Sequence, residues 1–254
     1  MTGTLFNKLL SHFRAQSPPS ENHRIPNILE TRLLGVSARF EAITSEDYGR
    51  ILRFDGESDY YREILKEVED DDCFWDIGSF IGLVAVLVAK KRPNSRIVAV
   101  EPDKSFCARI GKHLALNNIS NVELLEIGLS DEMGVLRLNT SGATGWAPSF
   151  YDKGLKRYAE VPVSTLDRIC MERPQLCPNV LKIDVEGFEA KVIRGSAMVL
   201  QSQKLRAIFL ELHPTLLLQN GERIGDLLAR IEKYGFRFRS FQGRRNEILA
   251  IALK

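Results

Sequence analysis

The residues best suited to chemistry begin at the end of one apolar segment, Phe74–Gly82, which reads FWDIGSFIG. It contains the pattern D-x-G-x-x-x-G, formed by Asp76, Gly78 and Gly82. Gly78 permits a tight turn, and Gly82 lets the start of a helix pack closely on the preceding strand. The acid in the first position and the lack of a third glycine at the right spacing distinguish the pattern from the dinucleotide fingerprint. A carboxylate favours a cationic or hydroxyl-bearing ligand over a pyrophosphate, and S-adenosylmethionine, whose methionine end carries an ammonium group, meets this requirement.

A second acid supports a nucleoside ligand. Glu101 follows the apolar segment Arg96–Val100 and lies about 20 residues after Gly82, the offset at which an acid accepts hydrogen bonds from ribose hydroxyls. Its two carboxylate oxygens match two hydroxyl donors. The alternative is a purely structural turn, but a strand, a helix, a second strand and an acid in one register favour a nucleoside site.

A charged segment, LKIDVEGFE at residues 181–189, follows later in the chain. Lys182, Asp184 and Glu186 come at the carboxyl end of a predicted central strand, where open α/β sheets bind their ligands. Charge at the end of a buried strand is costly unless it is paired or used. Asp184 or Glu186 could orient or deprotonate a substrate hydroxyl, and Lys182 could pair with either. The alternative is a structural cluster of a lysine and carboxylates.

One histidine has a promising position. His213 ends the segment FLELHP, two residues after Glu211, at the mouth of the predicted fifth strand. An ordinary histidine pKa of about 6.5 suits a general base at neutral pH. A hydrogen-bonded turn residue is the alternative. Asp184 and Glu186 provide too few ligands to predict a metal ion, so no metal site is predicted.

The elements that must position these residues alternate between short apolar and amphipathic segments, a pattern typical of a parallel sheet covered by helices on both faces. The predicted strands are Cys73–Ile77, Arg96–Val100, Val122–Ile127, Val180–Ile183 and Arg206–Leu212. Helices are predicted over Gly82–Lys91, after the N-cap Asp103, over 224–231, and after Gly187 with Glu189, Lys191 and Arg194 facing solvent.

The chain ends in a predicted antiparallel hairpin of Phe236–Phe241 and Ile248–Leu253 around a polar turn. Its last strand is apolar on both faces. We therefore predict that this strand lies between two neighbours inside the sheet rather than at its edge.

Residues 1–72 are predicted to form an accessory segment before a main domain at residues 73–254. Within the segment, Ala38–Ile43 and Arg50–Phe54 are predicted to pair as strands, and Asp59–Val68 is predicted to form a helix.

Two further regions have a recognisable character. The first residues form an amphipathic pattern, which fits either a core-capping helix or a helix that touches a membrane or a partner, and Gln16–Asn27 reads as a linker. Asn139–Glu160 is rich in Gly, Ser and Thr and is interpreted as a loop close to the site. It contains Trp146, Phe150, Tyr151 and Tyr158. Of these aromatic residues, Trp146, Tyr151 and Tyr158 could stack on a sugar or anchor the loop to the domain.

Composition excludes several classes of protein. The 254 residues are 44% hydrophobic and 27% charged with a net charge of +2, which indicates a soluble globular chain and disfavours a nucleic-acid partner. The longest uncharged apolar segment, Phe80–Ala89, is about half of the roughly 20 residues that a membrane-spanning helix needs. No secretory signal is recognised and the cysteines form no C-x-x-C pair, so reduced thiols and a cytoplasmic location are predicted. The oligomeric state stays open.

Several blocks together resemble the FkbM family of S-adenosylmethionine-dependent methyltransferases, within the class I methyltransferase fold. They are DIGSFIG at 76–82, VAVEPD at 98–103, GLSD at 128–131, STLD at 164–167 and LKIDVEGFE at 181–189. One departure is Ser79-Phe80, where the family usually has Ala-Asn.

The resemblance implies a Rossmann-like α/β fold: a seven-stranded, mostly parallel sheet with an antiparallel C-terminal hairpin and helices on both faces. It implies S-adenosylmethionine as methyl donor and O-methylation of a sugar, a glycan or glycolipid, or a natural-product small molecule. The implied donor contacts are, for the methionine end, Asp76, Gly78, Ser79, Phe80 and Gly82; for the ribose, Glu101 flanked by Pro102 and Asp103; and for the adenine edge, Gly128, Leu129, Ser130 and Asp131.

Alternatives remain at this stage. Ser130 and Asp131 could simply cap a turn before Gly134. For the whole chain, a non-enzymatic binding or assembly protein could retain the same fold. An NAD-dependent oxidoreductase is disfavoured by the glycine pattern and by the hairpin.

Overall fold

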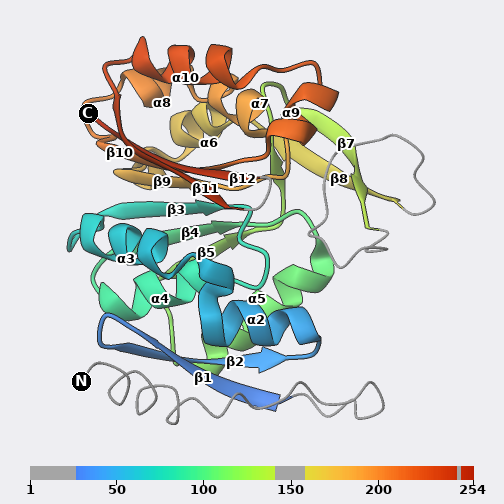
Figure 1. Cartoon of the computed structure of the whole chain (residues 1–254), viewed down its shortest axis with the longest axis vertical. Coiled ribbons are helices and arrows are strands. Elements are labelled where there is room, and N and C mark those ends of the chain that lie inside the picture. The colour runs from blue at the N-terminus through green and yellow to red at the C-terminus, as the bar shows by residue number, and fades with distance from the viewer. Residues whose placement is uncertain (1–26, 141–157, 245–246) are drawn as a thin grey trace, which may run out of the picture.

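The computed structural model describes residues 27–140, 158–244 and 247–254. Within these ranges the centre is a seven-stranded sheet in the order β11-β12-β10-β9-β3-β4-β5 (Figure 1). The five strands from β10 to β5 run parallel, and β12 runs antiparallel to both of its neighbours. The predicted mostly parallel sheet is confirmed. Its strands are β3 (Cys73–Ile77), β4 (Arg96–Val100), β5 (Val122–Leu125), β9 (Val180–Ile183), β10 (Ala207–Leu212), β11 (Arg237–Arg244) and β12 (Glu247–Leu253).

The C-terminal hairpin enters the sheet as predicted. β12 lies between β10 and β11, so its backbone groups pair on both sides. Ala250 and Ala252 face one hydrophobic cluster, while Leu249 and Ile251 face the other. Burial on both faces explains why this strand lacks the alternation of apolar and polar residues.

Helices cover both faces of the sheet (Figure 1). On one face lie α3 (Ser58–Glu67), α4 (Leu83–Lys91) and α5 (Lys104–Leu116); on the other lie α6 (Leu166–Glu172), α7 (Glu189–Arg194), α8 (Ala197–Gln201), α9 (Pro214–Gln219) and α10 (Ile224–Glu232). A 3-10 turn, η2 (Pro174–Leu176), follows α6. Successive strand residues point to opposite faces, so Phe74 joins the hydrophobic cluster around α4 and Trp75 joins the cluster around α6 and α7.

The helix predicted after Gly187 is interrupted. It divides into α7 and α8 at Gly195-Ser196, where a Cβ atom on Gly195 would lie 2.1 Å from the Ser130 carbonyl oxygen. The prediction that Glu189 faces solvent is wrong. Glu189 is completely buried because its carboxylate bonds to His213.

The described residues also contain a three-stranded sheet that the sequence did not predict. Its order is β6-β8-β7, from β6 (Gly128–Leu129), β7 (Gly134–Asn139) and β8 (Tyr158–Ser164). The ends of the predicted loop therefore belong to strands. Tyr158 lies in β8, with the Arg137 guanidinium 4.6 Å from its ring centroid. Trp146, Phe150 and Tyr151 lie outside the described residues.

The strand predicted at Ala38–Ile43 is present, but its predicted pairing with a strand at Arg50–Phe54 is wrong. The hairpin joins β1 (Asn27–Leu33) to β2 (Val36–Ala42), and the next residues form α2 (Ser45–Arg53). The cause is local: the Thr44 side chain accepts from the Asp47 amide while Asp47 accepts from the Thr44 amide, a capping box that starts a helix. A 3-10 turn, η1 (Phe54–Gly56), leads to the predicted helix, which is present as α3. The amphipathic N-terminus and the linker up to residue 26 lie outside the described residues.

The β1–β2 hairpin packs on the helical layer of α4 and α5 (Figure 1). Because α4 lies between the sheet and this hairpin, all its residues from Leu83 to Ala89 are buried. An ion pair of 3.0 Å between Asp47 of α2 and Arg109 of α5 joins the same layers. In the described ranges, no helix is both long enough and apolar enough to cross a bilayer.

Candidate active site

The D-x-G-x-x-x-G segment forms a tight turn between the carboxyl ends of β4 and β9. Gly78 and Gly82 both have left-handed backbones, with φ of 79° and 76°. A Cβ atom on Gly78 would lie 1.7 Å from the Asp184 carbonyl oxygen. The Gly78 and Ser79 amides each donate to the Val100 carbonyl at 3.0 Å. Glycine is therefore required at position 78 by both conformation and space.

Asp76 lies where it was predicted, but its carboxylate points into the protein. Its side chain is completely buried, with Oδ1 3.1 Å from Lys182 Nζ and Oδ2 accepting from the Ala85 amide at 3.1 Å. Burial raises the pKa of Asp76, and the charge of Lys182 opposes this shift. The side chain thus ties β3 to β9 and to the start of α4, beneath the turn.

Lys182 is the centre of this connection. Its Nζ lies 3.1 Å from the Gly78 carbonyl oxygen and 3.3 Å from Asp184 Oδ2, in addition to its contact with Asp76. Burial lowers the pKa of Lys182, but the charges of Asp76 and Asp184 raise it by more. The pairing predicted for Lys182 is present, and it fixes the turn of β3 against the end of β9.

Glu101 closes the other side of the turn. Its Oε2 accepts from the Phe80 amide at 2.8 Å and its Oε1 from the Asp103 amide at 2.9 Å. Burial raises the pKa of Glu101 to about 8, although these two hydrogen bonds lower it. Each oxygen retains a second lone pair that can accept from a hydroxyl group. Asp103 also caps α5, as predicted, and half-buried Pro102 lies between the two acids.

Ser79 and Phe80 have different tasks in the turn. The Ser79 hydroxyl donates to the Asp76 carbonyl at 2.6 Å and accepts from the Val100 amide at 3.1 Å. Phe80 has a left-handed backbone with φ of 52°, which is strained for an aromatic residue. Its ring centroid lies 4.2 Å from that of Phe106. The departure from the family's usual Ala-Asn thus places an aromatic surface on the turn.

The predicted catalytic residues converge at the carboxyl ends of β9 and β10. His213 Nε2 lies 3.5 Å from Glu186 Oε2 and 3.9 Å from Asp184 Oδ1, while its Nδ1 lies 2.8 Å from Glu189 Oε1. Glu189 also accepts from the Gly187 amide at 3.0 Å. We call Asp184, Glu186, Glu189 and His213 the proton-transfer cluster. Glu186, like Phe80, has a left-handed backbone, with φ of 49°.

The acids and the histidine perturb one another. Burial lowers the pKa of His213, but Glu189 and the other carboxylates raise it to about 10. Burial raises the pKa of Glu186 to about 7, against the effect of His213. Burial also raises the pKa of Asp184, but Lys182 and His213 lower it by more. At neutral pH the histidine is therefore protonated, and Glu186 is the group closest to its titration point.

The same residues bear on metal binding. Asp184, Glu186 and His213 offer ligand atoms that all lie within 4.8 Å of one another. The same three side chains contact one another as ion pairs. A metal ion bound there would displace the proton of His213.

The segment predicted at the adenine edge is held by other elements. Gly128 and Leu129 form β6, and the Ser130 amide donates to the Ser164 carbonyl at 2.9 Å. Asp131 Oδ2 accepts from Arg194 Nε of α7 at 2.9 Å. Among the residues that the structure describes, no hydrogen bond or ion pair joins 128–131 to the glycine turn. The contacts of Ser130 and Asp131 are therefore with β8 and α7, and a role at the adenine edge stays a prediction.

Two residues near the site were missed by the sequence analysis. Glu189 was assigned to a solvent-facing helix surface, and only its proximity to the charged segment could have suggested a role. Arg50 was placed in a strand, yet its guanidinium lies 4.7 Å from the Phe80 ring centroid. Its sequence neighbours carry no signal for that position.

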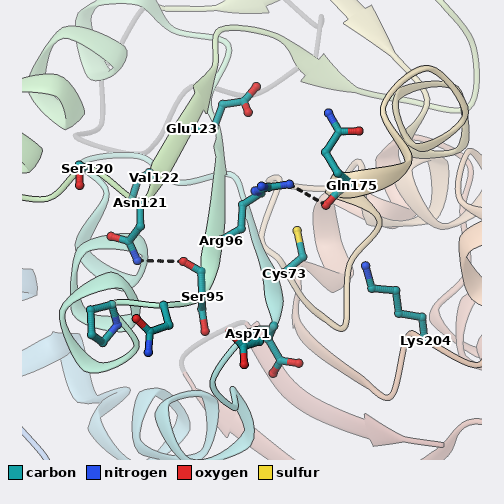
Figure 2. A pocket seen from close by; sticks show the side chains of 13 residues that line it. Asp71, Cys73, Ser95, Arg96, Ser120, Asn121, Val122, Glu123, Gln175 and Lys204 are labelled. Atoms are coloured by element: carbon teal, nitrogen blue, oxygen red, sulfur yellow. Dashed lines mark hydrogen bonds between the residues drawn. The ribbon is translucent and has the colours of Figure 1, made fainter.

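A polar cleft of about 540 Å³ opens elsewhere in the protein (Figure 2). Cys73, Arg96 and Val122, which begin β3, β4 and β5, line it, and Arg96 donates there to the Gln175 carbonyl at 3.1 Å. This is the amino end of the sheet. Because open α/β sheets bind ligands at the carboxyl ends of their strands, the cleft is not the candidate active site.

Known proteins are similar to this chain in sequence or in fold. The hexuronic acid methyltransferase AglP of Haloferax volcanii is 30% identical over 190 residues, which cover 75% of this chain and 75% of that protein. The methyltransferase sdnD of Sordaria araneosa is 27% identical, with 52% of this chain and 67% of that protein covered. The solved structure of a methyltransferase FkbM from Methylobacillus flagellatus KT has a TM-score of 0.51 at 15% identity, covering 77% of this chain and 46% of that one.

The structural likeness concerns the fold alone, but the sequence match is more specific. The methyltransferase FkbM domain matches residues 76–238, which run from the acid of the glycine turn into β11. This range contains the turn, Glu101 and the proton-transfer cluster, and it makes up more than half of the chain. The protein is therefore a methyltransferase that belongs to the FkbM family.

Proposed function

We propose that the protein transfers the methyl group of S-adenosylmethionine to a hydroxyl group of a sugar. The observation that carries this proposal is the proton-transfer cluster, which lies beside the glycine turn because the Gly78 backbone packs against Asp184. A turn that exposes backbone to a donor and a base next to it are the two parts that O-methylation requires.

The residues at the turn fit the methyl donor. Gly78 and Gly82 leave the backbone free of side chains, and the second lone pairs of Glu101 can accept from the ribose hydroxyls. Pro102 and Asp103 would flank the ribose. When bound, the donor supplies a methyl group already activated by a positively charged sulfonium. The chain supplies positioning, which can contribute up to about 7–11 kcal/mol.

Within the cluster we assign the base to Glu186. Its pKa of about 7 suits a group that must be ionised to take a proton from a hydroxyl at neutral pH. His213, held protonated by Glu189, stabilises the ionised Glu186 and orients it. Asp184, paired with Lys182, positions the acceptor hydroxyl. General-base help of this kind adds about 10²–10⁴-fold to the rate.

A sugar acceptor is supported by the similarity to the hexuronic acid methyltransferase, which extends over three quarters of both chains. A natural-product hydroxyl is the second candidate class. A cytoplasmic location is also part of the proposal, because the four cysteines are free and three of them are buried as reduced thiols.

Calorimetric titration tests the donor. We expect S-adenosylhomocysteine to bind and NADH, the control ligand, not to bind. Glu101→Ala should weaken the binding of S-adenosylhomocysteine by about 10-fold or more, since it removes the hydrogen-bond partner of the ribose hydroxyls. Glu186→Gln should keep donor affinity and lose methyl transfer. Binding of NADH alone, or an unchanged affinity in Glu101→Ala, would overturn the proposal.

A further inference from the structure

Arg50 comes from outside the matched domain but lies at its site. It belongs to α2, whereas the FkbM domain begins at residue 76. Its guanidinium carbon lies 4.7 Å from the centroid of the Phe80 ring, on the glycine turn. The side chain retains 29% exposure, so a ligand can reach it. A segment that precedes the domain thus contributes a cation to the glycine turn, Asp76–Gly82.

The hydrogen-bond donors of the Arg50 guanidinium are not used within the residues that the structure describes. A guanidinium carries five N–H donors in a planar fork. Within residues 27–140, 158–244 and 247–254, its ion pair is with Asp55, where Nε and Oδ2 are 3.6 Å apart, too long for a hydrogen bond. No hydrogen bond joins the Arg50 side chain to another residue in these ranges. Its donors are therefore available to a ligand.

The charges around Arg50 place it between two parts of the site. Burial lowers its pKa, while Tyr61, Asp184, Asp55 and Glu57 raise it by more. In the other direction, Arg50 lowers the pKa of both Asp184 and Glu186. Its electrostatic field therefore reaches the proton-transfer cluster, while its guanidinium stacks on the glycine turn.

We propose that Arg50 binds a carboxylate in the active site, carried either by the methionine end of the donor or by an acidic sugar acceptor. This inference rests on the proposed function and names the ligand group that the N-terminal segment recognises. The planar guanidinium matches a carboxylate through two parallel hydrogen bonds. With its guanidinium carbon over the Phe80 ring and 29% of its side chain exposed, Arg50 can present its donors to a ligand at the glycine turn.

The test compares Arg50→Gln with Arg50→Lys and a matched control, Arg53→Gln. Arg53 lies in the same helix but is exposed. Each protein is titrated with S-adenosylhomocysteine and with 5′-methylthioadenosine, which lacks the amino acid end. Each complex with S-adenosylhomocysteine is then titrated with methyl glucuronide and methyl glucoside, which differ in a carboxylate. Thermal melting verifies that the variants fold, and Arg50→Lys, which keeps the charge, replaces Arg50→Gln if the latter does not.

A donor carboxylate predicts that Arg50→Gln weakens S-adenosylhomocysteine by about 10- to 100-fold and leaves 5′-methylthioadenosine unchanged, with a smaller loss in Arg50→Lys. An acceptor carboxylate predicts a similar loss for the glucuronide alone. The inference is overturned if Arg50→Gln binds S-adenosylhomocysteine as tightly as wild type does and the wild-type protein shows no preference for the glucuronide over the glucoside. So does an equal loss in Arg53→Gln. Failure of the wild-type protein to bind S-adenosylhomocysteine at all would instead contradict the proposed function.

Discussion

His213 is held by Glu189: the imidazole Nδ1 lies 2.8 Å from a carboxylate oxygen of a side chain that is completely buried. The carboxylate accepts, so the Nδ1 proton is fixed and the ring presents Nε2 to Glu186. Glu189 itself lies too deep to meet a substrate. In the proposed mechanism it is a positioning residue whose effect on the reaction passes through His213.

Glu189→Gln should separate positioning from binding. The amide keeps the shape of the side chain but removes the charge, so the pKa of His213 falls toward its ordinary value. We expect methyl transfer to slow by about 10–100-fold, as when a buried carboxylate behind a functional histidine is removed. Affinity for S-adenosylhomocysteine, measured by calorimetry, should stay within about 2-fold. Glu123→Gln, at the other end of the sheet, is the control. A loss of donor binding as large as the loss of rate would contradict the assignment.

The pH profile of the reaction should follow Glu186. The carboxyl group must lose its proton before it can accept one, and its pKa is about 7. The rate is therefore expected to rise about tenfold per pH unit below pH 7 and to level off above it. Glu186→Gln should be slower by about 10²–10⁴-fold and should lack this rise. An unchanged profile in Glu186→Gln would show that another group takes the proton.

The same residue should limit the stability of the fold. The pKa of Glu186 is higher in the folded protein than the ordinary value of about 4.3, so the folded state binds more protons between these two values. Its contribution to the free energy of unfolding therefore decreases as the pH rises from about 4.3 to about 7. We expect the stability difference between Glu186→Gln and wild type, measured by thermal melting at each pH, to favour the variant more at pH 8 than at pH 4.5. A stability difference independent of pH would contradict the shift.

Two glycines in different turns allow the cost of a steric clash to be separated from the cost of a left-handed backbone. Gly35 and Gly78 share a φ of 79°, but a Cβ atom would meet nothing within 4 Å at Gly35 and would lie 1.7 Å from the Asp184 carbonyl oxygen at Gly78. Gly35→Ala should cost about 1–2 kcal/mol, the strain of a left-handed alanine. Gly78→Ala should cost more than about 4 kcal/mol and displace the proton-transfer cluster. Urea unfolding measures both, and equal costs would show that the packing at Gly78 relaxes freely.

Much of the sheet could be predicted because its signals are local. The buried strands β3, β4 and β9 have the predicted bounds, and the apolar pattern of β12 placed it inside the sheet. The placement of the charged residues at the strand ends followed from the same argument, since the carboxyl ends of parallel strands meet at one edge. That rule placed Lys182, Asp184 and His213 at the carboxyl ends of their strands before any distance was known.

The failures have a common cause in contacts between distant segments. The burial of Glu189 depends on His213, which follows 24 residues later, so helix periodicity alone assigned it to solvent. The short strand β6 pairs with β8, far along the chain, and two residues carry no strand pattern. Arg50 reaches the glycine turn only through the packing of α2. The wrong prediction for residues 45–53 has a different cause, because the capping box that starts this helix could have been recognised in the sequence.

A buried histidine joins the N-terminal segment to the glycine turn. His113 of α5 is completely buried, with Nδ1 2.8 Å from the Ile81 carbonyl oxygen and Nε2 accepting from the Glu41 amide at 3.0 Å. Ile81 belongs to the glycine turn and Glu41 to β2. Burial lowers the pKa of His113, so the neutral ring makes both bonds.

His113→Ala should therefore weaken the fold and the donor site together. It leaves a buried amide and a buried carbonyl unpaired, at about 1–3 kcal/mol each, which urea unfolding would measure. Because the folded pKa is below that of the unfolded chain, wild-type stability should fall as the pH drops below about 6.5, and this loss should shrink in the variant. The control Lys112→Ala removes an exposed partner of Glu41 from the same helix and should cost less than about 1 kcal/mol. If His113→Ala unfolds like this control and binds S-adenosylhomocysteine like wild type, the N-terminal segment supports the turn through other contacts.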